Sequence, residues 1–250
     1  MKRVLRPWWW LLDYLYAGWR QLIAVFRREA PSSYADGDPA LPAIVLLPGV
    51  YETWLFLEPS AQRLNAAGHG VFTVPGLGTN RRPIPESAEI VRQRLAALST
   101  EHGIERCILL AHSKGGLIGK YLMLDAAAAL EGDAGGHHPV EIMGLVAIGT
   151  PFSGSIYARY TLSRTIRHFS PTDAVLLSLK NQEAVNDRVV SVFPEFDPHI
   201  PGGSALAGAL NIELPVSGHF RTLRSGAVLD AVDEAVEHLS GACGPPAGCA

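Results

Sequence analysis

Cysteine is scarce in this sequence, with three residues in 250. An odd set of three excludes the disulfide framework typical of small secreted domains. Cys107 lies inside an apolar run and suits a small core side chain. Cys243 and Cys249 lie in a Gly- and Pro-rich tail with no neighbouring histidine, which makes a zinc site a poor interpretation. We expect this tail, residues 242–250, to be disordered.

An excess of charge of either sign is also missing. The 21 Lys and Arg residues nearly balance the 24 Asp and Glu residues, for a formal net charge of −3. No block of basic residues is interleaved with aromatics, so we expect no nucleic-acid partner. The apolar fraction of 48% is too high for a disordered chain, and this length can bury a substantial core without disulfides or metals.

The chain also lacks an uninterrupted apolar run of about 20 residues, the length that a membrane-spanning helix needs. Residues 7–28 are rich in Trp and Leu, but Asp13 and Arg20 interrupt them and no small-residue cleavage site follows, so a signal peptide is not indicated either. The apolar side chains recur at helical spacing on one face: Trp8, Leu11, Leu12, Leu15, Trp19, Leu22, Ile23 and Phe26. The opposite stripe carries Asp13, Ala17, Arg20, Ala24 and Arg27. We therefore predict an amphipathic helix over residues 1–30.

Beyond a linker at 31–42, short apolar runs alternate with helical patterns. The predicted strands are 43–47, 70–74, 106–111, 142–148, 188–193 and 209–214. The predicted helices are 59–68, 86–98, 115–130 and 227–239. Apolar strands that alternate with helices indicate a mostly parallel sheet with helices on both faces. We predict one six-stranded α/β domain over 43–241, with residues 152–186 as a short helical cap.

The stretch LLAHSKGGL, residues 109–117, places one hydroxyl between a buried strand and a buried helix. Ser113 would sit at a sharp bend that strains its backbone and points its side chain beyond the carboxyl end of the strand, where such sheets bind ligands. The small residues Ala111 and Gly115 let strand and helix pass closely. A helix N-cap is the ordinary interpretation of such a serine, but the paired Gly115 and Gly116 favour the bend.

Five segments in this order resemble the α/β-hydrolase family, and within it the bacterial esterase- and lipase-like hydrolases. They are LLPGVYETW (46–54), AHSKGG (111–116), AIGTPFSGS (147–155), VVSVFPEFDPHIP (189–201) and SGHFRTL (217–223). The resemblance covers residues 41–240. The order Ser, Asp, His, each near the end of a predicted strand, is more specific than any single segment.

The resemblance implies a role for each matching residue. Ser113 would be the nucleophile, His219 the general base and Asp197 the acid that orients it, with Glu195 as an open alternative. The backbone N–H groups of Lys114 and Val50 would form the oxyanion hole, with Tyr51 as the near alternative to Val50. No cofactor or metal is implied.

The sequence also departs from the family. Two strands that usually precede the core are missing, and Ala111 replaces a glycine. Lys114 places a cation beside Ser113, which would favour an anionic substrate unless its side chain reaches solvent. We predict that His112 is a packed, hydrogen-bonded histidine, and that His137 and His138 are solvated.

From these features we expect a serine hydrolase that cleaves carboxylic esters through an acyl-enzyme. The apolar side chains of the cap favour an apolar acyl or alcohol group on a small-molecule or lipid ester: Ile156, Tyr157, Tyr160, Leu162, Phe169, Val175, Leu176 and Leu177. The alternatives are an acyltransferase that uses the same acyl-enzyme, and a membrane-associated binding protein with a hydrolase fold and no catalysis.

The N-terminal helix has two interpretations. Its Trp-rich face could lie on a membrane surface or dock over the mouth of the site, with Lys2, Arg3, Arg6, Arg27 and Arg28 toward anionic headgroups. The same apolar face could instead pack on the domain. We expect a cytoplasmic protein, peripheral on the inner membrane surface if residues 7–28 bind lipid.

Overall fold

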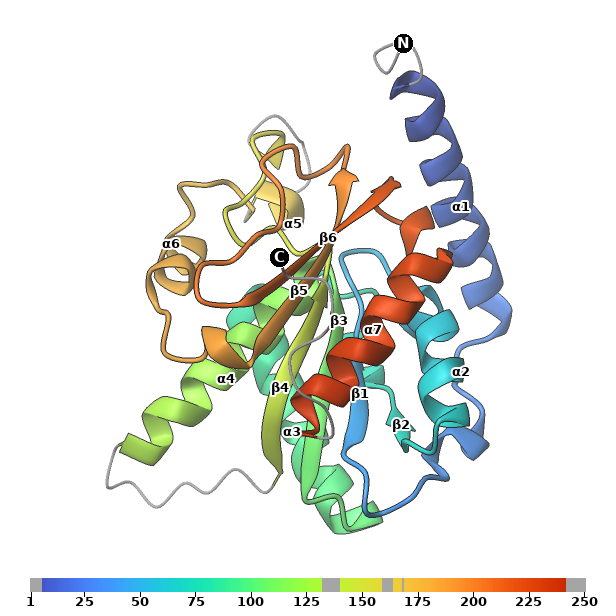
Figure 1. Ribbon diagram of the computed structural model, residues 1–250, viewed down its shortest axis with the longest axis vertical. Coiled ribbons are helices and arrows are strands. Elements are labelled where there is room, and N and C mark those ends of the chain that lie inside the picture. Colours follow the sequence, from blue (N-terminus) through green and yellow to red (C-terminus); the bar gives the residue numbers. More distant parts are fainter. Residues whose placement is uncertain (1–5, 132–139, 159–163, 168, 242–250) are drawn as a thin grey trace.

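In the part of the chain that the structure describes, six strands form one parallel sheet (Figure 1). The computed structural model describes residues 6–131, 140–158, 164–167 and 169–241. The strands are β1 (Ala43–Leu47), β2 (Val71–Phe72), β3 (Arg106–His112), β4 (Glu141–Ile148), β5 (Val189–Phe196) and β6 (Leu210–Ser217). They pair in the order β2-β1-β3-β4-β5-β6, always in parallel. The predicted α/β architecture with six strands is confirmed.

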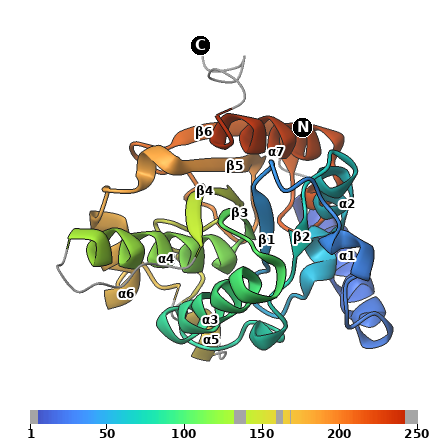
Figure 2. The ribbon, with the colours of Figure 1, turned by 90° about the horizontal axis from the view of Figure 1, so that it is seen from below.

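Helices cover both faces of this sheet (Figure 2). The helices α2 (Glu58–Ala66) and α7 (Gly226–Leu239) lie on one face, and α3 (Ile84–His102) and α4 (Lys114–Glu131) lie on the other. All five side chains of β1 are buried, as are those of β3 after Arg106. Burial on both sides explains why these strands are continuous apolar runs with no alternation.

The structure differs from the predicted elements mainly at their ends. β2 shrinks to two residues at the sheet edge, where it has one neighbour. β5 runs to Phe196, three residues beyond its predicted end, because its ladder with β6 continues through a register shift at Pro194. This extension carries the chain directly to Asp197.

The cap contains two short helices, α5 (Arg164–Arg167) and α6 (Ala174–Asn181), of which α6 lies at the side of the sheet, next to α4 (Figure 1). The Asp173 carboxylate caps α6 by accepting the N–H groups of Val175 and Leu176. Leu176 is buried in the core, whereas Ile156 and Leu177 are exposed. The predictions for His137, His138, Tyr160, Leu162 and the tail at 242–250 lie outside the described residues.

The N-terminal helix α1 (Arg6–Phe26) packs on the domain with its polar stripe. Asp13 and Ala17 are buried, whereas Leu15 and Phe26 are 60% and 82% exposed. Arg20 explains part of this orientation, because its guanidinium bonds the Glu58 carboxylate at 2.9 Å and the Leu55 carbonyl. Of the two interpretations of this helix, the packing of its apolar face on the domain is therefore the one that the structure contradicts.

Two further features of the N-terminal region bear on its predicted organisation. None of the helices in the described ranges has the length and hydropathy needed to cross a membrane. The predicted linker at 31–42 contacts the domain: Tyr34 is buried, and the carbonyls of Tyr34 and Asp36 accept the side-chain amide of Asn65.

One close contact sets where α4 begins. A Cβ atom on Gly115 would lie 1.9 Å from the carbonyl oxygen of Leu47 at the end of β1. The first turn of α4 and the end of β1 therefore approach to a separation that only glycine allows.

Gly115→Ala should consequently be strongly destabilising. Because the clashing atom is backbone, relief requires a shift of strand or helix, and overpacking of this kind costs about 1–3 kcal/mol or more. Thermal melts should show a Tm lowered by several degrees. Gly226→Ala is the matched control, since a Cβ there meets nothing within 4 Å; equal Tm values for both variants would contradict the close approach.

Candidate active site

Ser113 occupies the bend between β3 and α4. Its φ of +51° lies in the left-handed region, which is uncommon and strained for a residue with a side chain. Its N–H donates to the Ile148 carbonyl at 2.9 Å, and its carbonyl accepts the Thr150 hydroxyl at 3.0 Å. An ordinary N-cap serine has extended backbone angles, so the observed conformation is that of a sharp strand-to-helix bend.

His219 and Asp197 meet at the same edge of the sheet. Asp197 follows β5, His219 follows β6 and Gly218, and Nδ1 of His219 lies 2.7 Å from Oδ2 of Asp197. The other oxygen, Oδ1, accepts the N–H groups of His199 and Ile200. Both side chains are buried, whereas Glu195 is exposed. The structure thus brings Asp197, and not Glu195, into contact with His219.

A cavity of about 500 Å³ connects Ser113 with His219, since both residues line it. This volume suits a small organic ligand. Most of the remaining lining is apolar or aromatic: Trp10, Tyr14, Ala17, Val50, Tyr51, Pro151, Tyr157, Ala158, Ile166, Phe169, Ile200 and Phe220. Of the predicted cap side chains, Tyr157 and Phe169 contribute to it.

The surroundings of His219 favour its protonated form. Burial by itself lowers the pKa of His219, but the Asp197 charge and hydrogen bond, with Glu52 and Asp13 further away, outweigh burial and raise that pKa above 6.5. Burial likewise raises the pKa of Asp197, and the contacts with His219 and His199 bring it below its usual value. Asp197 is therefore an anion wherever His219 titrates.

The loop after β1 separates the two alternatives for the first oxyanion donor. Tyr51 adopts a φ of +61°, and its N–H donates to the Thr79 carbonyl at 2.8 Å. The N–H of Val50 has no hydrogen-bond partner among the described residues, and Val50 lines the cavity. The N–H of Lys114 begins α4, where first-turn amides have no acceptor within the helix. Val50 and Lys114 are thus the available donors.

The side chain of Lys114 points neither to the cavity nor to solvent, so both expectations for it are wrong. It is 2% exposed, and Nζ donates to the backbone carbonyls of Asn80 and Arg82 and to Oδ1 of Asn80. Burial, followed by the nearby Arg82 charge, lowers its pKa to about 8. Lys114 ties the bend at Ser113 to the loop before α3 and leaves the cavity without its charge.

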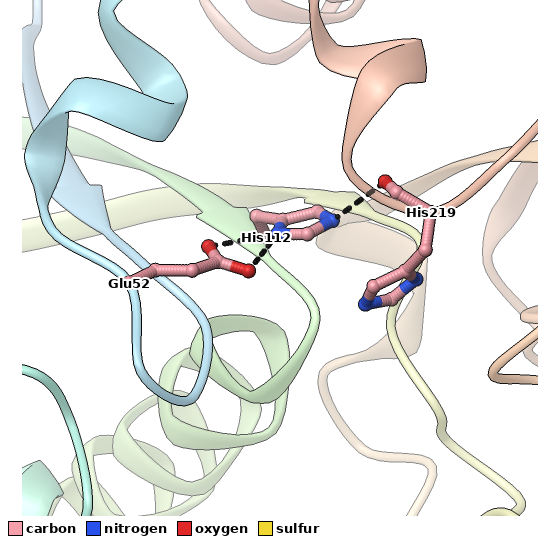
Figure 3. Close-up of side chains that lie close together, drawn as sticks. All are labelled: Glu52, His112 and His219. Atoms are coloured by element: carbon pink, nitrogen blue, oxygen red, sulfur yellow. Dashed lines mark hydrogen bonds and ion pairs between the residues drawn. The ribbon is translucent and has the colours of Figure 1, made fainter. Parts of the chain in front are cut away.

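Glu52 and His112 form a buried pair beside His219 (Figure 3). Nδ1 of His112 is 2.8 Å from both carboxylate oxygens of Glu52, and Nε2 is 3.2 Å from the backbone carbonyl of His219. Glu52 also accepts the Gly49 N–H at 2.8 Å. The prediction of a packed, hydrogen-bonded His112 is confirmed. Its partner Glu52 carried no sequence signal, because the two residues are 60 positions apart.

The only groups of potential metal ligands found in the described ranges include these histidines. One is Glu52, His112 and His219, and the other is Asp197, His199 and His219, each with ligand-type atoms within 4.8 Å of one another. Both nitrogens of His112 already face acceptors, and Nδ1 of His219 faces Asp197. Neither group presents an open set of ligands, so these contacts position the side chains.

Asp13 of α1 reaches the histidine loop from the other side. Its buried carboxylate accepts three consecutive backbone N–H groups, from His219 at 3.0 Å, Phe220 at 2.9 Å and Arg221 at 2.8 Å. In the sequence, Asp13 stands out as an interruption of the apolar run and as a member of the opposite, polar stripe. The available signal was a single carboxylate in the middle of an otherwise apolar helix.

His199 joins the same helix to the aspartate loop. Its Nε2 lies 3.0 Å from the Tyr14 hydroxyl, and its ring lies 5.0 Å from that of Trp10. Burial, then the charge of His219, lowers the pKa of His199 to about 3, so this ring is neutral near pH 7. α1 therefore contacts the loops of both Asp197 and His219.

Solved structures of hydrolases share this architecture. Lipase BlEst2 of Bacillus licheniformis, in its mature form, matches with a TM-score of 0.60 at 16% identity, over 80% of this chain and 94% of that one. The chain has the α/β-hydrolase fold. Lipase B of Aspergillus fumigatus matches with a TM-score of 0.63 at 14% identity, over 84% of this chain and 56% of that one.

Sequence comparison gives a shorter match. No protein-family model matches the chain. A curated relative named "Putative carbamate hydrolase RutD", from Variovorax paradoxus (strain S110), is 35% identical over 102 residues. This match covers 38% of the present α/β-hydrolase chain and 35% of the relative. The chain thus spans about a third of the length of that relative.

Asp13→Ala should destabilise the protein markedly. One buried and two partly buried N–H groups would lose their acceptor, and an unsatisfied buried group costs about 1–3 kcal/mol. We expect the free energy of unfolding to fall by about 3 kcal/mol or more in denaturant titrations. Asp230→Ala is the matched control, because Asp230 is exposed in a surface ion pair with Arg63 and should change stability by about 1 kcal/mol or less. Similar losses in both variants would refute the role of Asp13.

Proposed function

We propose that this α/β-hydrolase chain is a serine hydrolase that cleaves carboxylic esters with an apolar acyl or alcohol group. One observation carries the proposal: Ser113, at a strained bend, and His219, bonded to Asp197 at 2.7 Å, line the same largely apolar cavity. The fold shared with two lipases supports it. Because a fold alone does not decide activity, the proposal depends mainly on the arrangement of Ser113, His219 and Asp197.

The first half of the reaction forms an acyl-enzyme. Oγ of Ser113 attacks the ester carbonyl carbon while Nε2 of His219 takes the hydroxyl proton. Asp197 holds Nδ1–H and stabilises the imidazolium that results. Collapse of the tetrahedral intermediate breaks the bond to the alcohol oxygen, and His219 returns the proton to the departing alcohol.

The N–H groups of Val50 and Lys114 stabilise the oxyanion of that intermediate. Such donors act on charge that develops only in the transition state, and the loss of one typically costs about 10²–10³ in rate. In the second half, water attacks the acyl carbonyl carbon while Nε2 of His219 takes its proton. Collapse of the second tetrahedral intermediate breaks the bond to Oγ of Ser113, His219 returns the proton to Oγ, and the acid is released. An alcohol in place of water would give acyl transfer through the same intermediate.

The lining of the cavity favours uncharged, apolar substrates. Among the described residues that line it, none is Lys or Arg, and the Lys114 charge is directed elsewhere. The curated relative is named as a carbamate hydrolase, and a carbamate carbonyl would meet the same nucleophile. A carbamate ester therefore belongs beside the p-nitrophenyl esters in the substrate series, with product analysis in added alcohol to measure acyl transfer.

Ser113→Ala and His219→Ala should each abolish nearly all p-nitrophenyl ester hydrolysis, by about 10⁴-fold or more, with an unchanged far-UV spectrum. Because the two residues act as one unit, the double variant should be little worse than either single variant. A fluorophosphonate should label the wild type and not Ser113→Ala. Ser153→Ala is the control, since Ser153 is exposed in a nearby turn; it should be labelled normally. Labelling of Ser113→Ala would refute the assignment.

The pH profile tests the pairing of Asp197 with His219. The base must be neutral, so kcat/KM should fall as the pH drops through the raised pKa of His219, above 6.5. Asp197→Asn removes the largest influence that raises this pKa. Turnover should drop by up to about 10⁴, and the acid limb of the residual activity should move to lower pH.

Glu195→Gln serves as the control for this measurement. Glu195 is exposed and lies two residues before Asp197, so its removal should leave both turnover and the acid limb unchanged. A reversed pattern would transfer the role of the acid to Glu195.

A further inference from the structure

The outer face of α1 is apolar and open to solvent. It consists of Trp8, Leu11, Leu15, Trp19, Leu22 and Phe26, which are 48–82% exposed. The helix runs along one side of the molecule and extends past the carboxyl edge of the sheet (Figure 1). Contiguous exposed apolar surface of this kind is unusual on a soluble protein and marks an interaction surface.

Polar contacts on the opposite side of the helix hold this face outward. Asp13 accepts three N–H groups of the histidine loop, and Arg20 bonds Glu58 and the Leu55 carbonyl. If the helix turned its apolar face toward the domain, the N–H groups of the histidine loop and the Glu58 carboxylate would face apolar side chains and lose their hydrogen-bond partners. Burying polar groups without partners is costly. The orientation is therefore specified by the sequence of the helix.

The apolar face adjoins the mouth of the cavity. Trp10, Tyr14, Gly18 and Gln21, on one edge of the same helix, line the cavity that contains Ser113. Tyr14 is 51% exposed, so this edge joins the cavity lining to the outer face. Tyr157, in the cap, also lines the cavity and is exposed. Apolar surface at the mouth thus comes from two separate segments.

Charge identifies the kind of partner that this face suits. The outer face carries no charged residue. Just beyond its end Arg28 and Glu29 are exposed, and Arg27 is held by Glu58 at 2.6 Å. The sequence places Lys2, Arg3 and Arg6 at the other end. A parallel contact between two copies of α1 would bring the basic N-terminal ends together, which charge repulsion disfavours. A partner with an anionic, planar surface and an apolar interior matches both the apolar outer face and the basic residues beside it.

We propose that the outer face of α1 docks on an anionic lipid bilayer and turns the mouth of the cavity toward the lipid. The indole side chains of Trp8 and Trp19 would lie at the headgroup boundary, where aromatic residues with a polar atom are favoured. The supply of ester substrates from the bilayer into the cavity rests on the proposed function, whereas the docking itself does not.

Co-sedimentation of the full chain with vesicles tests the docking. The protein should bind vesicles that contain both phosphatidylglycerol and phosphatidylcholine. It should bind more weakly to vesicles of pure phosphatidylcholine, and more weakly to the mixed vesicles at high salt. The variant Leu15→Glu with Trp19→Glu should bind at least about tenfold more weakly. Leu41→Glu with Leu177→Glu is the matched control: it adds the same charge at exposed apolar positions away from α1, and it should bind like the wild type.

Three outcomes would overturn the proposal. The first is a wild type that does not bind anionic vesicles. The second is equal loss of binding in the two double variants. The third is a wild-type dimer in sedimentation analysis that Leu15→Glu with Trp19→Glu dissociates, since that would make a second copy the occupant of the face.

Activity measurements separate this proposal from the proposed function. The Leu15→Glu and Trp19→Glu variant should hydrolyse a short, water-soluble p-nitrophenyl ester at the wild-type rate and lose most hydrolysis of an ester embedded in vesicles. If the variant loses hydrolysis of both the soluble and the embedded ester, the outer face is part of the active site and the docking role is refuted. If the wild type binds vesicles but hydrolyses no ester, the proposed function fails and the docking stands.

Discussion

The close approach of α4 to the end of β1 is the constraint on which the rest of the site depends. Gly115 passes against the Leu47 carbonyl with no room for a Cβ atom. The chain can make this approach only by bending sharply after β3, which puts Ser113 in a left-handed conformation at the carboxyl edge of the sheet. The same bend places the first-turn amides of α4, which have no acceptor within the helix, directly after Ser113.

Around this bend, buried polar groups join loops that are far apart in the sequence. Glu52 and His112 connect the loop after β1 to the end of β3 and, through the His219 carbonyl, to the loop after β6. Thr150 and Lys114 hold the bend from two other sides. Satisfied polar networks in a low-dielectric interior favour one arrangement over others. The loop after β1, the bend at Ser113 and the loop after β6 are thus held relative to one another by the buried side chains of Glu52 and His112.

The helix α1 extends this network to the surface. Its buried Asp13 accepts three amides of the histidine loop, and Tyr14 contacts His199 in the aspartate loop. A helix that anchors itself by hydrogen bonds and an ion pair can leave its apolar side chains in solvent. The opposite arrangement, with the apolar stripe buried, is the usual one for an amphipathic helix. The departure is what makes the outer face of α1 available to a lipid partner.

The sequence by itself determined the order of strands and helices, the parallel sheet and the positions where Ser113, Asp197 and His219 fall in it. The strands and helices follow from local periodicity, since strands buried on both faces are apolar runs, and the bend at Ser113 follows from its small neighbours. Asp197 and His219 followed from the resemblance of their segments to α/β-hydrolases. Tertiary structure alone decided which carboxylate meets His219, where the Lys114 side chain ends and which face of α1 lies inward. Each of those outcomes depends on groups brought together from distant positions, such as Asp13 with the loop at 219–221, and pairing at such separations leaves no pattern in a single sequence.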